Sequence, residues 1–378
     1  MDFMKKEIIE RTLQKSNISE EIKIISKKIL NFQRITPNEG LILYIKGELG
    51  FLGMLANYVK ENINKQLVYY NQNLHIEPTN ICLYKCKFCS YSSKNNEDAW
   101  ELSEQQIIKK IKKHFNNQIT EIHIVGGVHP DRDLHYYGNI IKKIKQLFPT
   151  IHIKAFTAVE IDYMSKKSGL SLLDGLNALK SYGLDSIPGG GAEILDDQIR
   201  KQICGAKSNS KTWLLVHETA HQLGIPSNAT MLYGHIEHYK HRIAHLNLLR
   251  ELQDKTTGFN AFIPLKFRNK RNELAGINEV SVIEDLKNYA VCRIFFDNIP
   301  HIKAYWPMIG KETAQISLSF GVDDLDGTIN DSTKIYSKAG ADDINPMMDK
   351  NEMINFIKNA NRIPVERDSL YNIINKLS

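Results

Sequence analysis

The sequence predicts an α/β fold in which a TIM-type (β/α) barrel carries an N-terminal helical extension and C-terminal helices. From about Leu67 onward, seven or eight short apolar segments alternate with amphipathic segments, each long enough for one crossover helix. Polar and glycine-rich residues follow most of the apolar segments, where a barrel carries its chemistry. Because no low-complexity linker interrupts this alternation, one barrel, complete or partial, is favoured over two separate domains.

The first 66 residues are expected to be helices outside the barrel. Apolar residues recur there at the spacing of one helix face, namely Ile22, Ile25, Ile29 and Phe32. Thr36 and Glu39 flank Pro37 in the pattern of a capping box, which predicts the start of a helix. A second capping box, Ser103 with Gln106, predicts the start of a crossover helix.

The expected strands lie near 74–77, 120–125, 151–156, 184–187, 227–231, 259–263 and 301–305, with a weaker one near 319–323. The resulting units are a helical extension at 1–66, a barrel at 67–345 and a helical tail at 346–378 that packs on the barrel. Alternation places His75 and Glu77 on one face of their strand, and His152, Lys154 and Phe156 on one face of another. If these faces point inward, they line a cavity for a polar ligand; if outward, they lie under helices.

Composition excludes several classes of protein. Hydrophobic residues make up 42% of the 378 residues and charged residues 24%, so the chain has enough apolar material for a sizeable core. The net charge of +6 is scattered through helical stretches, so no nucleic-acid partner is expected. No run of 18 apolar residues predicts a membrane span, and the first residues lack an apolar leader, so a cytoplasmic location is expected.

Three cysteines directly after the first predicted strand form the pattern C-x-x-x-C-x-x-C: Cys82, Cys86 and Cys89. Three thiolates on one loop can bind three irons of a 4Fe–4S cluster and leave the fourth iron open. Cys204 and Cys292 are distant in sequence, which argues against an electron carrier with four cysteine ligands. A structural zinc site usually has paired C-x-x-C units and a full set of four ligands, so zinc is the weaker alternative.

This spacing, with Phe88 before the third cysteine, resembles the radical S-adenosylmethionine (SAM) superfamily. The resemblance implies a radical SAM type of barrel, a 4Fe–4S cluster with an open iron, and SAM bound to that iron. Gly126-Gly127 resembles the turn that contacts the SAM amino group, although Val128 replaces the usual acidic residue. The residues to which the resemblance assigns SAM contacts are Phe88, Gly126, Gly127, Glu160 and Glu193.

Longer segments resemble one family within this superfamily, aminofutalosine synthase of the futalosine route to menaquinone. They include HIEPTNICLYKCKFCSYS (75–92), EIHIVGGVHP (121–130), IHIKAFTAVE (151–160), GLDSIPGGGAEIL (183–195), SNATMLYGHIE (227–237), FIPLKFRN (262–269), DNIPHIKAYWPMIG (297–310) and DLDGTI (324–329). Cyclic dehypoxanthinylfutalosine synthase and the deazaflavin synthases share parts of this pattern. The HIEPTN opening favours aminofutalosine synthase over them.

The resemblance implies a transferase that adds the 5′-deoxyadenosyl radical from SAM to 3-[(1-carboxyvinyl)oxy]benzoate. Rearrangement and loss of the carboxylate carbon as bicarbonate or CO₂ would give 6-amino-6-deoxyfutalosine, with methionine released. The sibling cyclase, which abstracts hydrogen, is the first alternative. The reaction also needs an electron donor such as flavodoxin or ferredoxin, and a homodimer is one of the open oligomeric states.

The substrate that the resemblance implies is a dicarboxylate, so cationic and aromatic side chains near the strand ends are candidates for binding it: Lys154, Lys266, Arg268 and Tyr305. The solvated rim of the barrel is the alternative place for the cations. His75 and Glu77 belong to the family segment, and we expect them to orient the substrate or relay a proton.

A competing motif, His217-Glu218-Thr219-Ala220-His221, matches the H-E-x-x-H pattern of zinc hydrolases. On a helix the two histidines would share one face and Glu218 could act as a general base. However, the motif falls on a predicted crossover helix outside the barrel, and Ser227 stands where a third histidine would follow. Zinc hydrolysis is therefore the remote alternative.

Overall fold

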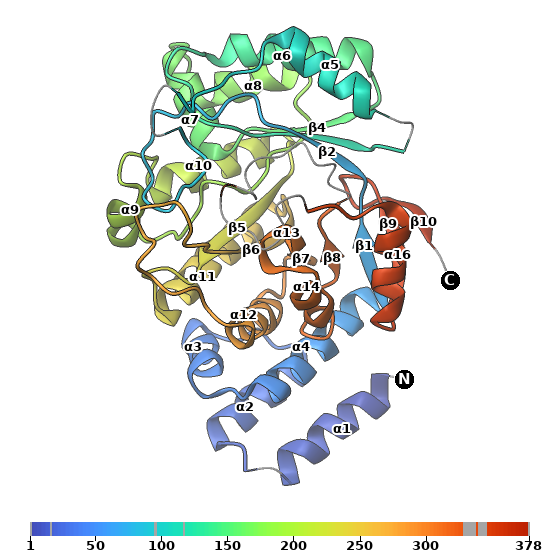
Figure 1. The fold of residues 1–378 in the computed structure, drawn as a ribbon. Helices are drawn as coiled ribbons and strands as arrows, with labels where there is room; N and C mark the ends of the chain where they lie inside the picture. Colours follow the sequence, from blue (N-terminus) through green and yellow to red (C-terminus); the bar gives the residue numbers. More distant parts are fainter. Residues whose placement is uncertain are drawn as a thin grey trace.

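The structure is a computed structural model, and it describes residues 2–15, 17–93, 97–115, 118–327, 338 and 346–376. The barrel forms its centre, with the N-terminal helices at one end of the molecule (Figure 1). Most of the predicted barrel segment 328–345 and the last two residues of the predicted tail lie outside the described residues.

Parallel strands form the barrel wall. They are β1 (Leu67–Tyr70), β2 (Asn73–Ile76), β3 (Glu121–Ile124), β4 (His152–Ala155), β5 (Ser227–Tyr233), β6 (Phe259–Lys266), β7 (His301–Ala304) and β8 (Asp324–Leu325). β2, β3 and β4 pair in sequence, as do β5, β6, β7 and β8. Two isolated bridges through Ser186 and Ile187 connect β4 to β5.

The barrel closes through β1 and β2, which are separated only by Asn71 and Gln72. β1 pairs with β8, whereas β2 pairs with β3. These two short strands therefore act as one bent strand between the first and last parts of the wall. The TIM-type architecture predicted from the alternation of elements is confirmed.

Two of the expected strands differ from the structure. Only Ser186 and Ile187 of the segment 184–187 form bridges, so no full strand exists there. The segment 319–323 begins in a turn, because Ser319 and Phe320 donate to the carbonyls of Ile316 and Ser317 and extend the preceding helix. The strand itself, β8, starts one residue after that segment.

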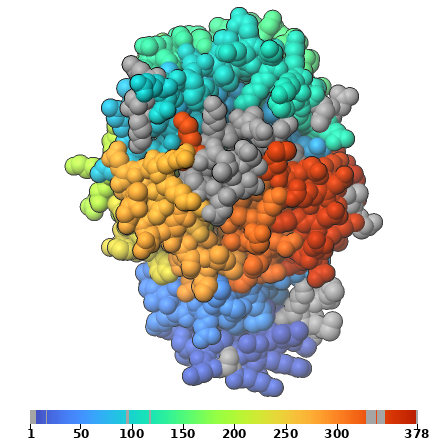
Figure 2. All heavy atoms as spheres, in the orientation of Figure 1, coloured from blue at the N-terminus to red at the C-terminus, as the bar shows by residue number. Residues whose placement is uncertain are grey.

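The N-terminal extension consists of α1 (Asp2–Lys15), α2 (Glu20–Leu30), α3 (Pro37–Lys46) and α4 (Leu49–Asn64). Thr36 and Glu39 form the predicted capping box at the start of α3. Ile22, Ile25 and Ile29 are buried, but Phe32 lies beyond the end of α2 and is exposed. α3 and α4 pack against α12 (Val282–Phe295), and in Figure 2 the N-terminal residues, in blue, form one end of the molecule.

The C-terminal segment contains α16 (Lys350–Asn359), β9 (Ile363–Arg367) and β10 (Ile373–Lys376). The prediction of a helical tail is right for α16 and wrong after it, because β9 pairs in parallel with β1 over four residues. β10 returns antiparallel to β9. The tail is thus part of the sheet that forms the barrel wall, as Figure 1 shows at the red end of the chain.

The remaining helices cover the barrel. They are α5 (Glu104–His114), α6 (Leu134–Leu147), α7 (Ala158–Lys167), α8 (Leu172–Tyr182), α9 (Asp197–Cys204), α10 (Ser210–Gln222), α11 (Tyr239–Thr256), α13 (Trp306–Ile309) and α14 (Lys311–Ser317). Ser103 and Gln106 form the predicted capping box of α5. Within the described ranges, no helix combines the length and apolarity that a membrane span requires.

Candidate active site

A cavity of about 300 Å³ occupies the barrel interior and reaches the loop that carries the cysteines. Alternate residues of the strands point into it, as strand geometry requires. Its polar lining includes residues from β3, β4, β5 and β7 and one residue just after β8: Glu121, His123, Lys154, Asn228, Thr230, Lys303 and Asp326. We call Glu121, His123, Lys154, Lys303 and Asp326 the inner cluster. The interior therefore carries charged and polar side chains within a largely apolar lining, and Lys154 faces inward, which answers the question of register left open by the sequence.

The cysteine loop follows β2 and is hydrogen-bonded to the turn after β3. The backbone N–H of Gly127 donates to the carbonyl of Thr79 at 2.8 Å, and that of Leu83 donates to Val128 at 2.8 Å. A Cβ on Gly127 would lie 2.2 Å from the carbonyl oxygen of Ile81, so only glycine permits this approach. The two glycines are thus needed to pack the cysteine loop against β3, whatever ligand they also contact.

The cysteine loop fits an iron–sulfur cluster in its donor chemistry. Cys82, Cys86 and Cys89 are all free thiols, and Cys82 and Cys89 are partly exposed. In the described part of the chain, no three potential ligands converge as they would on a single metal ion. A cubane cluster binds each thiolate to a different iron and does not need such convergence.

Cys204 lies closer to this loop than its position in the sequence suggests. It is the last residue of α9, whose Ile203 carbonyl accepts a hydrogen bond from the N–H of Lys87 at 2.8 Å. Burial raises the pKa of the Cys86 thiol to about 12, and the charges of Glu193 and of the nearby Cys204 add to this effect. The expectation that Cys204 is remote holds in sequence but not in space.

The residues expected to contact SAM divide into two groups. Phe88 and Glu193 line the cavity, and Lys207 connects them: its ammonium pairs with Glu193 at 2.7 Å and lies 5.2 Å from the centre of the Phe88 ring. Glu160 lies behind the turn instead. Its two carboxylate oxygens accept from the N–H groups of Gly126 at 3.2 Å and Thr157 at 2.7 Å.

Burial raises the pKa of Glu160 to about 7, against the opposing effect of these hydrogen bonds. The carboxylate joins the N-terminus of α7 to the glycine turn and does not line the cavity. The geometry gives Glu160 a positioning role at the glycine turn, and its direct contact with SAM stays a prediction.

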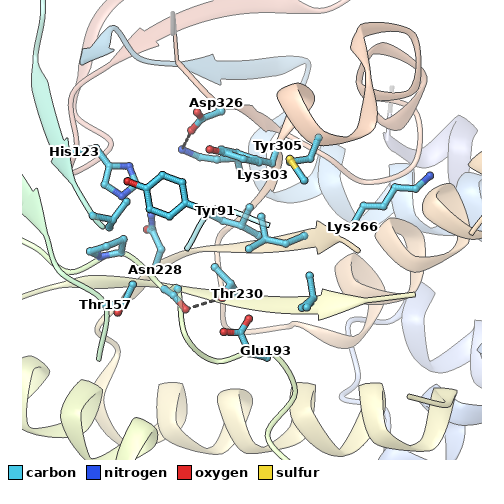
Figure 3. Close-up of a pocket in the computed structure, with 18 of the residues that line it drawn as sticks. Tyr91, His123, Thr157, Glu193, Asn228, Thr230, Lys266, Lys303, Tyr305 and Asp326 are labelled. Atoms are coloured by element: carbon cyan, nitrogen blue, oxygen red, sulfur yellow. Dashed lines mark hydrogen bonds and ion pairs between the residues drawn. The ribbon is translucent and has the colours of Figure 1, made fainter. Parts of the chain in front are cut away.

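The residues expected to bind substrate are also divided. Lys154, Arg268 and Tyr305 line the cavity with their side chains at its wall. Lys266 contributes to the wall, but its ammonium pairs with Asp285 of α12 at 2.7 Å, and Figure 3 shows the side chain directed away from the other labelled residues. The physical reason is alternation: Ile263 and Leu265 of β6 line the cavity, so the following residue faces α12.

His75 and Glu77, the expected catalytic residues, are both buried on or just after β2. The His75 ring lies 4.6 Å from the His123 ring, and its Nε2 is 3.8 Å from Oδ2 of Asp326. Glu77 lies near Tyr91, where its charge adds to the effect of burial in raising the pKa of that phenol. His75 thus borders the inner cluster, and Glu77 lies close to the cysteine loop.

Sequence reasoning missed His123, Asn228, Thr230, Lys303 and Asp326 as cavity residues. His123 and Lys303 each lie two residues from a residue that also lines the cavity, Val125 and Tyr305 respectively. The sequence contains this alternation of side chains along each strand. It identifies the cavity residues only once one residue of the strand is known to face inward.

The histidine pair of α10 lies outside the barrel cavity, with His217 buried and His221 half-buried. As predicted, His217 and His221 share one helix face, but both bond to the hydroxyl of Ser227, at 2.8 and 2.7 Å. His221 also bonds to the hydroxyl of Thr256 at 2.7 Å. Burial lowers the pKa of both imidazoles, that of His221 to about 4. The pair connects α10 to β5 and α11, and the geometry offers no support for a zinc site there.

Comparison with known proteins agrees with this geometry. Residues 76–249 match the model of the radical SAM superfamily, and residues 256–377 match that of the CofH/MqnC C-terminal region. The chain is 42% identical to the aminodeoxyfutalosine synthase of Thermus thermophilus over 352 residues, which cover 92% of this chain and 94% of that one. This chain belongs to the aminodeoxyfutalosine synthase family of radical SAM enzymes. Membership of the superfamily implies a 4Fe–4S cluster and SAM.

Other relatives and structures extend the comparison. The aminodeoxyfutalosine synthase of Streptomyces coelicolor is 37% identical over 93% of each chain. The cyclic dehypoxanthine futalosine synthase of the same organism is 35% identical over 89% of this chain and 85% of that one. The crystal structure of methylornithine synthase (PylB) aligns with a TM-score of 0.72 and 16% identity, over 90% of this chain and 97% of that one, which supports the fold alone.

Proposed function

We propose that this family member acts as an aminodeoxyfutalosine synthase on 3-[(1-carboxyvinyl)oxy]benzoate. The observation that carries the proposal is the 42% identity to the Thermus thermophilus enzyme over nearly the whole chain. The reaction joins the 5′-deoxyadenosyl group of SAM to the enolpyruvyl carbon, with loss of the carboxylate carbon as bicarbonate or CO₂. The products are 6-amino-6-deoxyfutalosine and methionine.

We further propose that Cys82, Cys86 and Cys89 are the three protein ligands of the cluster, so that the fourth iron binds SAM. When bound, the reduced cluster and SAM supply the 5′-deoxyadenosyl radical. The cysteine loop lies at the carboxyl end of β2, which places it at the end of the barrel where such enzymes carry their chemistry. The Gly126-Gly127 turn holds this loop, and Glu160 holds the turn.

The chain's own residues then orient the reactants and exclude water. Phe88, Glu193 and Tyr305 line the part of the cavity nearest the loops, where SAM and the enolpyruvyl group would meet. Lys154 and Arg268 supply positive charge to the wall. An electron donor such as flavodoxin or ferredoxin, a cytoplasmic location and the oligomeric state, including a homodimer, remain predictions.

The test is product analysis after anaerobic reconstitution with iron and sulfide, followed by reductant, SAM and 3-[(1-carboxyvinyl)oxy]benzoate. Mass spectrometry should show a product that contains the adenosyl group and lacks the substrate's carboxylate carbon. Release of 5′-deoxyadenosine and methionine without that adduct would contradict the proposed substrate while leaving the radical SAM assignment in place.

The second candidate is the sibling cyclase reaction, which the match to the CofH/MqnC C-terminal region and the 35% identity to the Streptomyces cyclase favour. Incubation with dehypoxanthine futalosine in place of the benzoate substrate distinguishes the two. We expect no cyclised product. Cyclisation at a rate above that of adduct formation would reverse the assignment.

A further inference from the structure

The two lysines of the inner cluster have different partners. Lys154 Nζ lies 2.6 Å from Oε2 of Glu121, a short ion pair in which both side chains are buried. Lys303 Nζ lies 3.4 Å from Oδ1 of Asp326 and 3.6 Å from Oδ2 of Asp324. Charge-assisted hydrogen bonds are normally shorter than about 3 Å. The Lys154 ammonium therefore forms a close ion pair with Glu121. The Lys303 ammonium lies farther from its two carboxylates, Asp324 and Asp326, and Figure 3 marks its contact with Asp326.

The C-terminal hairpin occupies one of these two acids. Arg367 of β9 donates to both carboxylate oxygens of Asp324, at 3.2 and 2.7 Å, and the Tyr371 hydroxyl donates to Oδ2 at 2.5 Å. Asp324 and Arg367 are buried in the wall of the barrel, and Tyr371 is half-buried beside them. Because Arg367 compensates the charge of Asp324, the positive charge of Lys303 is directed to the cavity and to Asp326.

Two buried polar atoms of the inner cluster also lack a hydrogen-bond partner among the described residues. They are Nε2 of His123 and Oδ2 of Asp326. Both side chains line the cavity. A buried polar atom without a partner destabilises the folded state. An N–H at His123 Nε2 can donate to an oxygen of a ligand that also contacts the Lys303 ammonium, whereas the Asp326 oxygen only accepts.

We propose that Lys303 binds the ring carboxylate of the substrate within the inner cluster, while the enolpyruvyl group faces the cysteine loop. This proposal rests on the proposed function, which supplies a substrate with two carboxylates at opposite ends. The enolpyruvyl double bond must lie near the loop that binds the cluster and SAM. The ring carboxylate then reaches deeper into the barrel, to Lys303. The ammonium of Lys303 is farther from its acidic partners than that of Lys154 is from Glu121.

A proton is expected to accompany the carboxylate. Around the site, Lys303 with Asp326, Lys154 with Glu121, and Arg367 with Asp324 already balance as charged pairs. The other titratable groups that face it are His75 from β2 and His123 from β3, and burial lowers the pKa of both, so they are neutral. An added carboxylate would leave one uncompensated charge in a buried site, which is costly. Binding of the ring carboxylate therefore takes up a proton, so the affinity for it falls as the pH rises.

The experiment measures dissociation constants on the reconstituted enzyme, under anaerobic conditions, for the full substrate and for an analogue that lacks the ring carboxylate. Lys303→Gln should weaken binding of the full substrate roughly 30-fold or more, as expected when one partner of a buried charge pair is removed. Binding of the analogue should change by less than about 3-fold, since it makes no such pair. Lys311→Gln, on α14 outside the cavity, is the matched control and should change neither value.

Equal weakening of both ligands by Lys303→Gln would overturn the proposal, because it would indicate a role in supporting the barrel. Unchanged binding of both ligands would overturn it as well. The wild-type enzyme gives an independent test that needs no folded variant: it should prefer the full substrate to the analogue, and this preference should decrease from pH 6.5 to pH 8.5. Absence of a preference refutes the role of Lys303, whereas failure of the wild type to convert the full substrate refutes the proposed function itself.

Discussion

The cysteine loop after β2 and the histidine pair on α10 both carry residue types and spacings that bind metals, but their surroundings differ. The three thiols lie on a loop at the carboxyl end of the barrel, beside a cavity that contains charged side chains, and two of them are partly exposed. The two imidazoles are packed between α10 and β5 and bond to protein hydroxyls. A ligand motif can bind metal only when its lone pairs remain available and a ligand can reach them.

The largest expected effect is on the cysteine loop. Cys86→Ala should abolish both the cluster absorbance and product formation, because one iron loses its only protein ligand. Cys204→Ala is the matched control, since this thiol is close to Cys86 but is not one of the three proposed ligands. Reconstituted iron content and turnover are the measurements. Loss of the cluster in Cys204→Ala, or turnover in Cys86→Ala, would contradict the three-cysteine ligand set.

Substitution in the Gly126-Gly127 turn should reduce activity nearly as much as loss of a cysteine ligand. A methyl group on Gly127 would lie 2.2 Å from the Ile81 carbonyl oxygen, so Gly127→Ala must displace the cysteine loop. We expect at least a tenfold drop in turnover, with reduced iron incorporation. Gly50→Ala is the control, because its methyl group would meet no atom within 4 Å and it lies in helix α4. Full activity in Gly127→Ala would show that close packing of the glycine turn against the cysteine loop is not needed for activity.

The histidine pair should affect stability and not chemistry. His217→Ala removes a fully buried ring that packs 3.9 Å from the Trp213 ring and bonds to Ser227. The cavity and the lost hydrogen bond should lower the free energy of unfolding by about 3 kcal/mol. Iron content and turnover per folded molecule should match the wild type. Denaturant unfolding and kinetics check both statements, and a complete loss of turnover in folded protein would revive the zinc hypothesis.

The smallest expected effect is on the pH dependence of stability. Burial lowers the pKa of His221 from 6.5 to about 4, so between these values the unfolded chain binds more protons than the folded chain. His221 alone should therefore lower the free energy of unfolding by about 1.6 kcal/mol as the pH falls from 6.5 to 5. His221→Gln should flatten this part of the profile. An unchanged slope in denaturant unfolding would show that the imidazole titrates normally.

The sequence predicted the parts of this molecule that depend on local pattern. The capping boxes at Thr36 and Ser103, the alternation of strands and helices, and the cysteine loop all depend on residues close together in the chain. The family resemblance supplied the activity, which composition and spacing alone could not.

The remainder depends on contacts between distant segments. β9 was missed because its pairing with β1 joins residues about 300 positions apart, and a five-residue segment gives little signal of its own. The sequence could not show that Lys303 faces the cavity and that the Lys266 ammonium faces a helix. A shift of one residue in the alternation of a strand moves each side chain from the cavity face to the face covered by helices. Cys204 looked remote because it is more than 100 residues from the cysteine loop in sequence. The fold brings the end of α9 against that loop, which sequence separation cannot show.

The most direct test of this account is the metal content of the purified wild-type chain after anaerobic reconstitution with iron, sulfide and zinc all present. If the cysteine loop is the metal centre and the histidine pair is structural, analysis should find about four iron and four sulfide per chain and no stoichiometric zinc. One tightly bound zinc per chain, with little sulfide, would contradict the account.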